Sequence, residues 1–249
     1  MQAFRRRIEI RSRSTTTGGE VRAALEDDFH HFRVTVRHKD GIVSAVEGAS
    51  PRHPFTACPA AAGQLQALQG MALTTVASSV TRHVEDASEQ CTHLLDLAGL
   101  AIATAAVGLA RRCYEIDVPR ENGHVTAAHL LRDDAYRLDW KLDGGRIAGP
   151  PPFAGVSLHE GFARMALSTL PPDQAEAAIV LRRCAVIGAG RLKNIDLEPH
   201  AKPAGRCYAQ QPARAPLAIR IVGSTLDFST RASALCEGDA RWLAFATET

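Results

Sequence analysis

The sequence has no marked excess of charge of either sign. Its 249 residues include 29 lysines and arginines against 27 aspartates and glutamates, and the formal net charge is +2 at pH 7. Proteins that bind nucleic acids rely on a strongly basic surface to neutralise phosphates. We therefore expect a small, neutral or weakly acidic partner and no nucleic acid.

Long apolar runs are also missing. The longest apolar stretch without a charge, residues 97–110, is well short of the ~20 residues that span a bilayer. Residues 1–7 end in three arginines, and alternating charged and apolar residues follow them in place of the apolar core of a secretory signal. These two absences predict a cytoplasmic protein that does not enter a membrane.

The cysteines lack the spacing of a disulfide framework. No Cys-x-x-Cys pair occurs, and the intervals between cysteines are wide and irregular. We therefore expect reduced thiols, which are the usual state in a cytosol. The six cysteines are Cys58, Cys91, Cys113, Cys184, Cys207 and Cys236.

The short motifs of the most easily recognised enzymes are absent too. The sequence contains no Walker motif, no Gly-x-Ser-x-Gly and no His-Glu-x-x-His. A Gly-Ala-Gly segment at residues 188–190 follows a predicted helix and not a strand, so it is no dinucleotide-binding turn. We expect no nucleotide or flavin cofactor.

The first 50 residues do show a clear pattern, the alternation of apolar and polar residues that is typical of strands. The Asp-Gly pair at residues 40–41 predicts a hairpin over residues 31–47, and an earlier strand extends it to a meander. Because the apolar phase shifts between Leu25 and Phe32, we expect a turn or bulge near Asp27 and Asp28.

Helical patterns follow this meander. An alanine-rich segment after Pro59 predicts a short helix that ends at Gly70. A capping box at residues 86–89 precedes a long apolar helix from Cys91 to about Arg112. The first turn of that helix favours a thiolate, so we expect a lowered pKa for Cys91.

The order of strands and then helices is repeated in the second half. After an expected linker at residues 120–124, the alternation returns over residues 125–142, and capping boxes at residues 157–160 and 173–176 predict two helices. One further strand is expected at residues 217–222. We therefore predict an α+β protein with two units, residues 1–119 and 120–249.

Several separated motifs carry a resemblance to one family. The motifs are Leu25-Glu-Asp-Asp-Phe-His-His, Cys58-Pro, Cys91-Thr-His-Leu, Gln211-Pro-Ala-Arg and Gly223-Ser-x-x-Asp-Phe228. Together they resemble the domain-of-unknown-function 2889 family over nearly the whole chain, and this kinship implies a role in bacterial aromatic-compound catabolism such as lignin degradation.

Residues 26–112 also show a distant similarity to iron–sulfur scaffold proteins of the NifU type. In that family an aspartate and three cysteines converge, and Asp28, Cys58 and Cys91 match three of these four positions. The first cysteine is replaced by Glu26. The resemblance implies an antiparallel meander plus helices of the NifU/SufE type for this unit, and a metal-binding or iron–sulfur scaffold-like module as an alternative function.

The candidate catalytic residues come from this same region. A carboxylate beside a histidine can accept a proton, and groups at a helix N-terminus can polarise a substrate. Neighbours on a strand point to opposite faces, so only one of His30 and His31 can join the site. The candidates are Asp28, His30, His31, Cys91 and His93.

Three residues are candidates for substrate binding. Arg52 could anchor a phenolate or a carboxylate, although a solvated loop residue is an equal alternative. Trp140 could stack on an aromatic ring or pack a sheet. Cys58 would line the same pocket as the catalytic candidates.

A metal site is the alternative use of the same residues. The mixed oxygen, nitrogen and sulfur donors of Asp28, Cys58, Cys91 and His93 suit zinc better than a complete iron–sulfur cluster. The competing interpretation is that the two cysteines are small buried apolar side chains. We expect no cofactor, with zinc as the alternative.

These observations lead to an expected function. We expect an enzyme, a cofactor-independent carbon–carbon lyase of the aldehyde-lyase type that releases formaldehyde by retro-aldol cleavage of a lignin-derived phenylpropanoid. The small aromatic substrate rests on the family resemblance, and the reaction type rests on the missing cofactor motifs and the expected base. A subunit that acts by binding another protein, and a homo-oligomer, remain open.

Overall fold

The computed structural model describes residues 2–246, which divide into two compact units. Unit 1 contains residues 2–7, 113–195 and 227–235, and unit 2 contains residues 8–112, 196–226 and 236–246. Neither unit is a continuous half of the chain. The expected boundary at residue 119 falls inside a strand, and the expected linker is a tight hairpin turn in which Asn122 and Gly123 both have positive φ.

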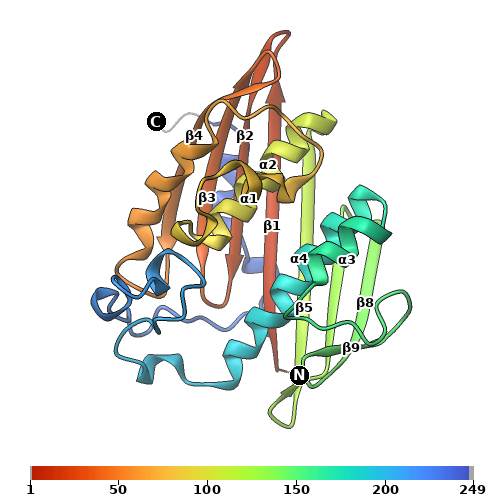
Figure 1. The fold of residues 1–249 in the computed structure, drawn as a ribbon, viewed down its shortest axis with the longest axis vertical. Helices are drawn as coiled ribbons and strands as arrows, with labels where there is room; N and C mark the ends of the chain where they lie inside the picture. Colours follow the sequence, from red (N-terminus) through yellow and green to blue (C-terminus); the bar gives the residue numbers. More distant parts are fainter. Residues whose placement is uncertain (1, 247–249) are drawn as a thin grey trace. The chain divides into compact units, whose positions relative to one another are not determined.

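Unit 2 contains the predicted N-terminal meander (Figure 1). Its strands lie in the order β4-β3-β2-β1, and β3 pairs antiparallel with both β2 and β4. Alternate apolar residues are buried on one face because the register aligns them, with Val21 opposite Val36 and Leu25 opposite Phe32. The strands are β1 (Gln2–Ser14), β2 (Gly18–Asp27), β3 (His31–Lys39) and β4 (Ile42–Arg52), with β1 contributing to this unit from Ile8 onward.

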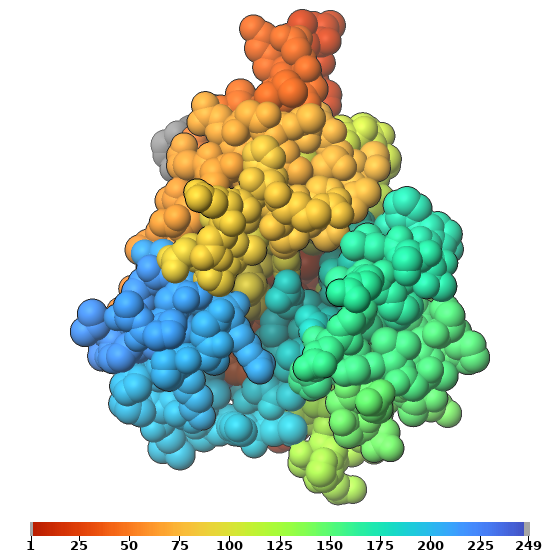
Figure 2. All heavy atoms as spheres, viewed as in Figure 1, coloured from red at the N-terminus to blue at the C-terminus, as the bar shows by residue number. Residues whose placement is uncertain are grey.

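Helices cover the apolar face of this meander (Figures 1 and 2). Helix α2 (Thr92–Val107) packs against β2 and β3, and it ends at Gly108, whose left-handed conformation stops the helix before the expected end at Arg112. The expected helix after Pro59 is a 3-10 helix. The shorter elements of this layer are η1 (Cys58–Leu68), η2 (Ala77–Ser79), α1 (Val80–His83) and η3 (Ala87–Glu89).

Unit 1 contains the second meander and its two helices. The strands lie in the order β5-β7-β8-β9, with β6 paired to β5, and α4 packs on β7 and β8. Trp140 is buried here against Phe153 and Phe162, with ring centroids 5.1 and 5.5 Å away. The elements are β5 (Arg111–Glu121), β6 (His124–Val125), β7 (Ala127–Arg132), β8 (Tyr136–Asp143), β9 (Arg146–Gly149), α3 (Phe162–Thr169), α4 (Pro172–Gly188) and η4 (Ala189–Leu192).

Residues 195–246 contain short helical turns. The strand expected at residues 217–222 is wrong, because only isolated bridges at Ile219 and Arg220 occur there. The turns are η5 (Ile195–Leu197), η6 (Tyr208–Gln210), η7 (Ala215–Leu217), η8 (Ala232–Ala234), η9 (Glu237–Asp239) and α5 (Ala240–Leu243).

The prediction of a mixed α+β fold with antiparallel strands is confirmed. Among the described residues, no helix combines the length and the apolar character that a membrane span requires.

Candidate functional site

The turn between β2 and β3 holds the most concentrated group of candidate residues. Asp27 closes this turn, because its Oδ1 accepts hydrogen bonds from the backbone N–H groups of Phe29 (2.7 Å) and His30 (2.8 Å). The backbone N–H of Asp27 donates to the carbonyl of His30 at 2.8 Å. An aspartate that binds the N–H groups two and three residues later forms a typical side-chain turn. The predicted break in the strand pattern is therefore this turn.

Asp27 and His30 form a buried carboxylate–imidazole pair. Nδ1 of His30 lies 3.1 Å from Oδ1 and 3.2 Å from Oδ2 of Asp27, and the two residues are 8% and 0% exposed respectively. A carboxylate that accepts a hydrogen bond from Nδ1 fixes the tautomer in which Nε2 is the basic nitrogen. This arrangement can accept a proton from a substrate.

His93 completes the group from the first turn of α2. Its ring centroid lies 4.1 Å from that of His30, with an angle of 32° between the ring planes. One side-chain donor atom from each of Asp27, His30 and His93 lies within 4.8 Å of the other two, and residues 2–246 contain no other such group of three. The sequence pointed to His30 and His93 but to Asp28 in place of Asp27.

Asp28 is next to the group but does not belong to it. The residue is fully buried, and its carbonyl accepts hydrogen bonds from the backbone N–H of Leu226 at 2.7 Å and from Arg52 at 3.1 Å. Either aspartate could accept the N–H groups two and three residues later, and the hydrogen bonds from Phe29 and His30 identify Asp27 as the one that does so.

Arg52 holds this turn and is not placed to anchor a substrate. Its guanidinium donates to the carbonyls of Asp27, Asp28 and His30 at 2.5, 3.1 and 3.2 Å. It also donates to the carbonyl of Ser224 at 3.0 Å and to Glu26 at 3.3 Å. Since a guanidinium has five N–H donors, these acceptors occupy most of its capacity.

His31 points away from the group, as strand alternation requires. Its Nε2 lies 2.8 Å from Oδ2 of Asp239, a fully buried carboxylate whose Oδ1 accepts from Nε of Arg33 at 2.5 Å. His31 therefore connects β3 to the C-terminal segment of unit 2. Of the two adjacent histidines, His30 is the one that joins Asp27 and His93.

Cys58 and Cys91 are buried thiols outside the group. Burial raises the pKa of Cys91 to about 12 and outweighs the backbone N–H groups of Leu94 and His93, which lower it. The pKa of Cys58 is also raised by burial to about 12. The prediction of a lowered pKa for Cys91 at the N-terminus of α2 is therefore wrong, because desolvation raises this pKa by more than the helix N–H groups lower it. Both side chains are neutral near pH 7.

Trp140, the remaining candidate, is a core residue of unit 1 and only 1% exposed, so it cannot stack on a substrate without rearrangement.

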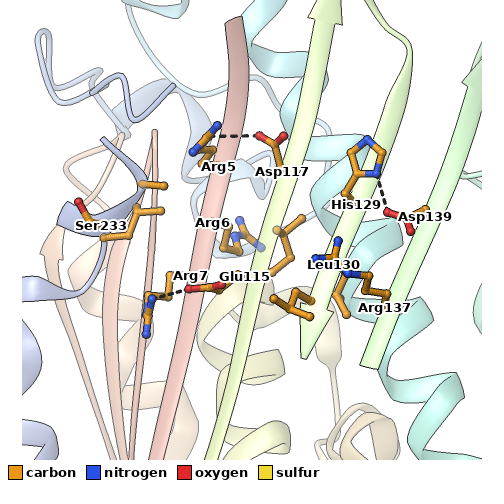
Figure 3. Close-up of a pocket in the computed structure, with 14 residues that line it drawn as sticks. Arg5, Arg6, Arg7, Glu115, Asp117, His129, Leu130, Arg137, Asp139 and Ser233 are labelled. Atoms are coloured by element: carbon orange, nitrogen blue, oxygen red, sulfur yellow. Dashed lines mark hydrogen bonds and ion pairs between the residues drawn. The ribbon is translucent and has the colours of Figure 1, made fainter. Parts of the chain in front are cut away.

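A second group of polar residues, which the sequence did not reveal, lines a pocket of about 560 Å³ in unit 1 (Figure 3). Arg5 pairs with Asp117 at 3.2 Å and Arg7 pairs with Glu115 at 2.6 Å. Nδ1 of His129 lies 2.7 Å from Asp139. In the two arginine–carboxylate pairs the opposite charges neutralise each other, which is the usual arrangement of a solvated sheet face. The pocket therefore gives less indication of chemistry than the group around Asp27.

Comparison with known proteins gives a limited result. No curated protein and no solved structure matches the chain. The likeness of residues 26–112 to iron–sulfur scaffold proteins therefore stays a prediction. Residues 4–107 match the model of a family described as protein of unknown function (DUF2889), which confirms the family resemblance over the segment that carries Asp27, His30 and His93.

Proposed function

We propose that the protein is a carbon–carbon lyase of the aldehyde-lyase type that releases formaldehyde from a hydroxymethyl-bearing, lignin-derived aromatic compound. The observation that supports this proposal is the buried pair of Asp27 and His30, with Nδ1 of His30 3.1 Å from the carboxylate and the ring of His93 4.1 Å away. The aromatic substrate class rests on the family resemblance.

The reaction requires one base and no electron carrier. Nε2 of His30 takes the proton of the primary hydroxyl group, and the oxygen electrons form the C=O bond of formaldehyde as the carbon–carbon bond breaks. The electron pair of that bond passes to an unsaturated acceptor group of the substrate. His30 then returns the proton to the carbon that lost the hydroxymethyl group, so atoms and charge balance.

Each residue of the group has a separate role in this proposal. Asp27 orients the imidazole of His30 and stabilises its protonated form, as a carboxylate does in a catalytic triad. His93 donates a hydrogen bond to the developing oxyanion from the N-terminal turn of α2, where the helix dipole also favours negative charge. Cys91 has no part in the reaction.

The test is formaldehyde release from a panel of hydroxymethyl-bearing aromatic compounds by the purified full-length protein. We expect His30→Gln to lower kcat about 10²- to 10⁴-fold, which is the range for losing a general base. Asp27→Asn should lower kcat with a smaller effect on KM. His129→Gln is the control, because His129 is an exposed histidine in unit 1 that also pairs with an aspartate. If no compound of this class releases an aldehyde, the proposal is wrong.

A further inference from the structure

The same three side chains present the donor atoms of a metal site. Asp27 offers a carboxylate oxygen, and His30 and His93 each offer a ring nitrogen, with all three atoms within 4.8 Å of one another. Two imidazoles and one carboxylate form a common donor set for zinc, in which the fourth position stays open. The set differs from the ligands expected from the sequence, of which only His93 is retained.

The separations within the group fit a single ion. Two ligands that bind one zinc ion at about 2.0–2.2 Å with tetrahedral geometry are roughly 3.4 Å apart. Nδ1 of His30 is 3.1 and 3.2 Å from the two oxygens of Asp27, so these two ligands need little movement. His93 lies in the first turn of α2, and its donor atom is within 4.8 Å of the other two, so a change of its rotamer has to bring this third atom to the ion.

The surroundings hold the donors in place before any ion binds. The backbone N–H groups of Phe29 and His30 fix the carboxylate of Asp27. The ring of Phe32 packs against both imidazoles, with centroid distances of 5.3 Å to His30 and 5.9 Å to His93. Metal sites depend on such surrounding contacts to orient their ligands, and an apolar ring beside the donors strengthens the attraction between the carboxylate and a cation.

We propose that Asp27, His30 and His93 bind one divalent transition-metal ion, with zinc as the ion that their chemistry favours. The cation site does not depend on the proposed reaction. The effect of the ion on catalysis rests on the proposed reaction, because the nitrogen of His30 that faces Asp27 cannot hold a proton and a metal ion together. A bound ion therefore removes the support that Asp27 gives to His30 as a base, and zinc inhibits formaldehyde release.

The test is direct measurement of metal binding to untagged, full-length protein stripped with a chelator. Zinc affinity is measured by competition with a chromophoric chelator, and Co²⁺ is added as a spectroscopic probe of nitrogen and oxygen ligation. We expect one ion per chain. Asp27→Asn and His93→Gln should each weaken zinc binding by at least about 100-fold. Removing a residue that only supports a metal ligand already weakens metal binding by up to about 100-fold, and these two changes remove ligands.

Two control variants show whether the loss is specific. His31→Gln changes the neighbouring histidine, which pairs with Asp239, and Cys91→Ala removes a ligand that was expected from the sequence. Both should keep the wild-type affinity. Circular dichroism of each variant checks folding, and a wild-type protein that binds no stoichiometric zinc overturns the proposal even if a ligand variant does not fold.

The outcomes separate the two proposals. Absence of stoichiometric zinc binding by wild-type protein, or its loss in Cys91→Ala alone, overturns the metal site and leaves the lyase proposal intact. Zinc binding that depends on Asp27 and His93 supports the site, whether or not any aldehyde is released. Formaldehyde release that rises on adding zinc overturns the expected inhibition and assigns the ion a catalytic role.

Discussion

Nε2 of His31 lies 2.8 Å from Oδ2 of Asp239, although the two residues are 208 positions apart in the sequence. Asp239 is fully buried and also accepts from Nε of Arg33 at 2.5 Å. Burying a carboxylate without partners costs folding free energy, so the folded state depends on the hydrogen bonds from these two side chains to Asp239. The contact fixes the C-terminal segment of unit 2 to the strand that follows the candidate site.

Asp239→Ala should therefore destabilise the protein. The change leaves His31 and Arg33 without their shared acceptor, and we expect the free energy of unfolding to fall by about 3 kcal/mol, as for other broken buried ion pairs. Urea unfolding measures this difference. Asp139→Ala is the matched control, because Asp139 pairs with His129 on the surface, and its loss should cost less than about 1 kcal/mol. Equal effects of the two changes would show that Asp239 has no special role.

Arg52→Lys should loosen the turn that carries Asp27 and His30. A lysine cannot reproduce the fork that reaches the carbonyls of Asp27, Asp28 and His30. Each buried acceptor that loses its partner lowers the free energy of unfolding by about 1–3 kcal/mol.

Hydrogen exchange of the backbone N–H groups of Phe29 and His30 measures this loosening. Both amides bind Asp27 in the turn, and we expect their exchange to accelerate more than that of Val34 in the centre of β3. Arg37→Lys serves as the control, since Arg37 pairs with Glu47 at the surface. Unchanged protection in Arg52→Lys would remove Arg52 as the residue that holds the turn.

The N-terminal meander could be predicted because its signals are local. The alternation that ends at Leu25 and resumes at Phe32 gave both strands and the turn between them, and the register places these two residues opposite each other. The pattern does not distinguish Asp27 from Asp28. Both are acidic and adjacent, and only the hydrogen bonds to the later N–H groups identify Asp27 as the residue that closes the turn.

Contacts between distant segments could not be predicted. Nothing near Asp239 indicates that it pairs with His31, and nothing near Ser224 indicates that its carbonyl accepts from Arg52. The interleaving of the two units has the same origin, since residues 196–226 and 236–246 return to the N-terminal meander. The raised pKa of Cys91 could not be predicted for a related reason, because the sequence shows a helix N-terminus but not the burial that has the larger effect on this pKa.

Trp140→Ala should destabilise unit 1. The indole is 1% exposed and packs against Phe153 and Phe162, so its truncation leaves a large cavity. We expect a loss of about 3–5 kcal/mol in the free energy of unfolding, measured by urea titration. Trp140→Phe should cost less and should leave the KM for an aromatic substrate unchanged. A raised KM in a stably folded Trp140→Phe variant would restore the interpretation of Trp140 as a substrate-binding residue.

The buried thiols predict a loss of stability at alkaline pH. Burial raises the pKa of Cys58 and of Cys91 to about 12, whereas a thiol in the unfolded chain has a pKa of about 8.5. Between these values the unfolded state releases a proton that the folded state retains, so the free energy of unfolding falls as pH rises. The full contribution of each thiol is present below about pH 8.5 and is lost progressively toward pH 12.

The expected slope is up to about 1.4 kcal/mol per pH unit for each thiol within this window. Urea unfolding at pH 8, 9 and 10 measures it, and the double variant Cys58→Ala/Cys91→Ala removes both contributions while lysines and tyrosines continue to titrate. The difference in slope between wild type and double variant therefore belongs to the two thiols. The same burial predicts slow alkylation of Cys58 and Cys91 in the folded protein at pH 8, because the thiolate is the reactive species. Rapid alkylation under native conditions, together with identical slopes, would mean that at least one of these thiols is ionised and accessible, and would restore Cys91 as a candidate reactive group.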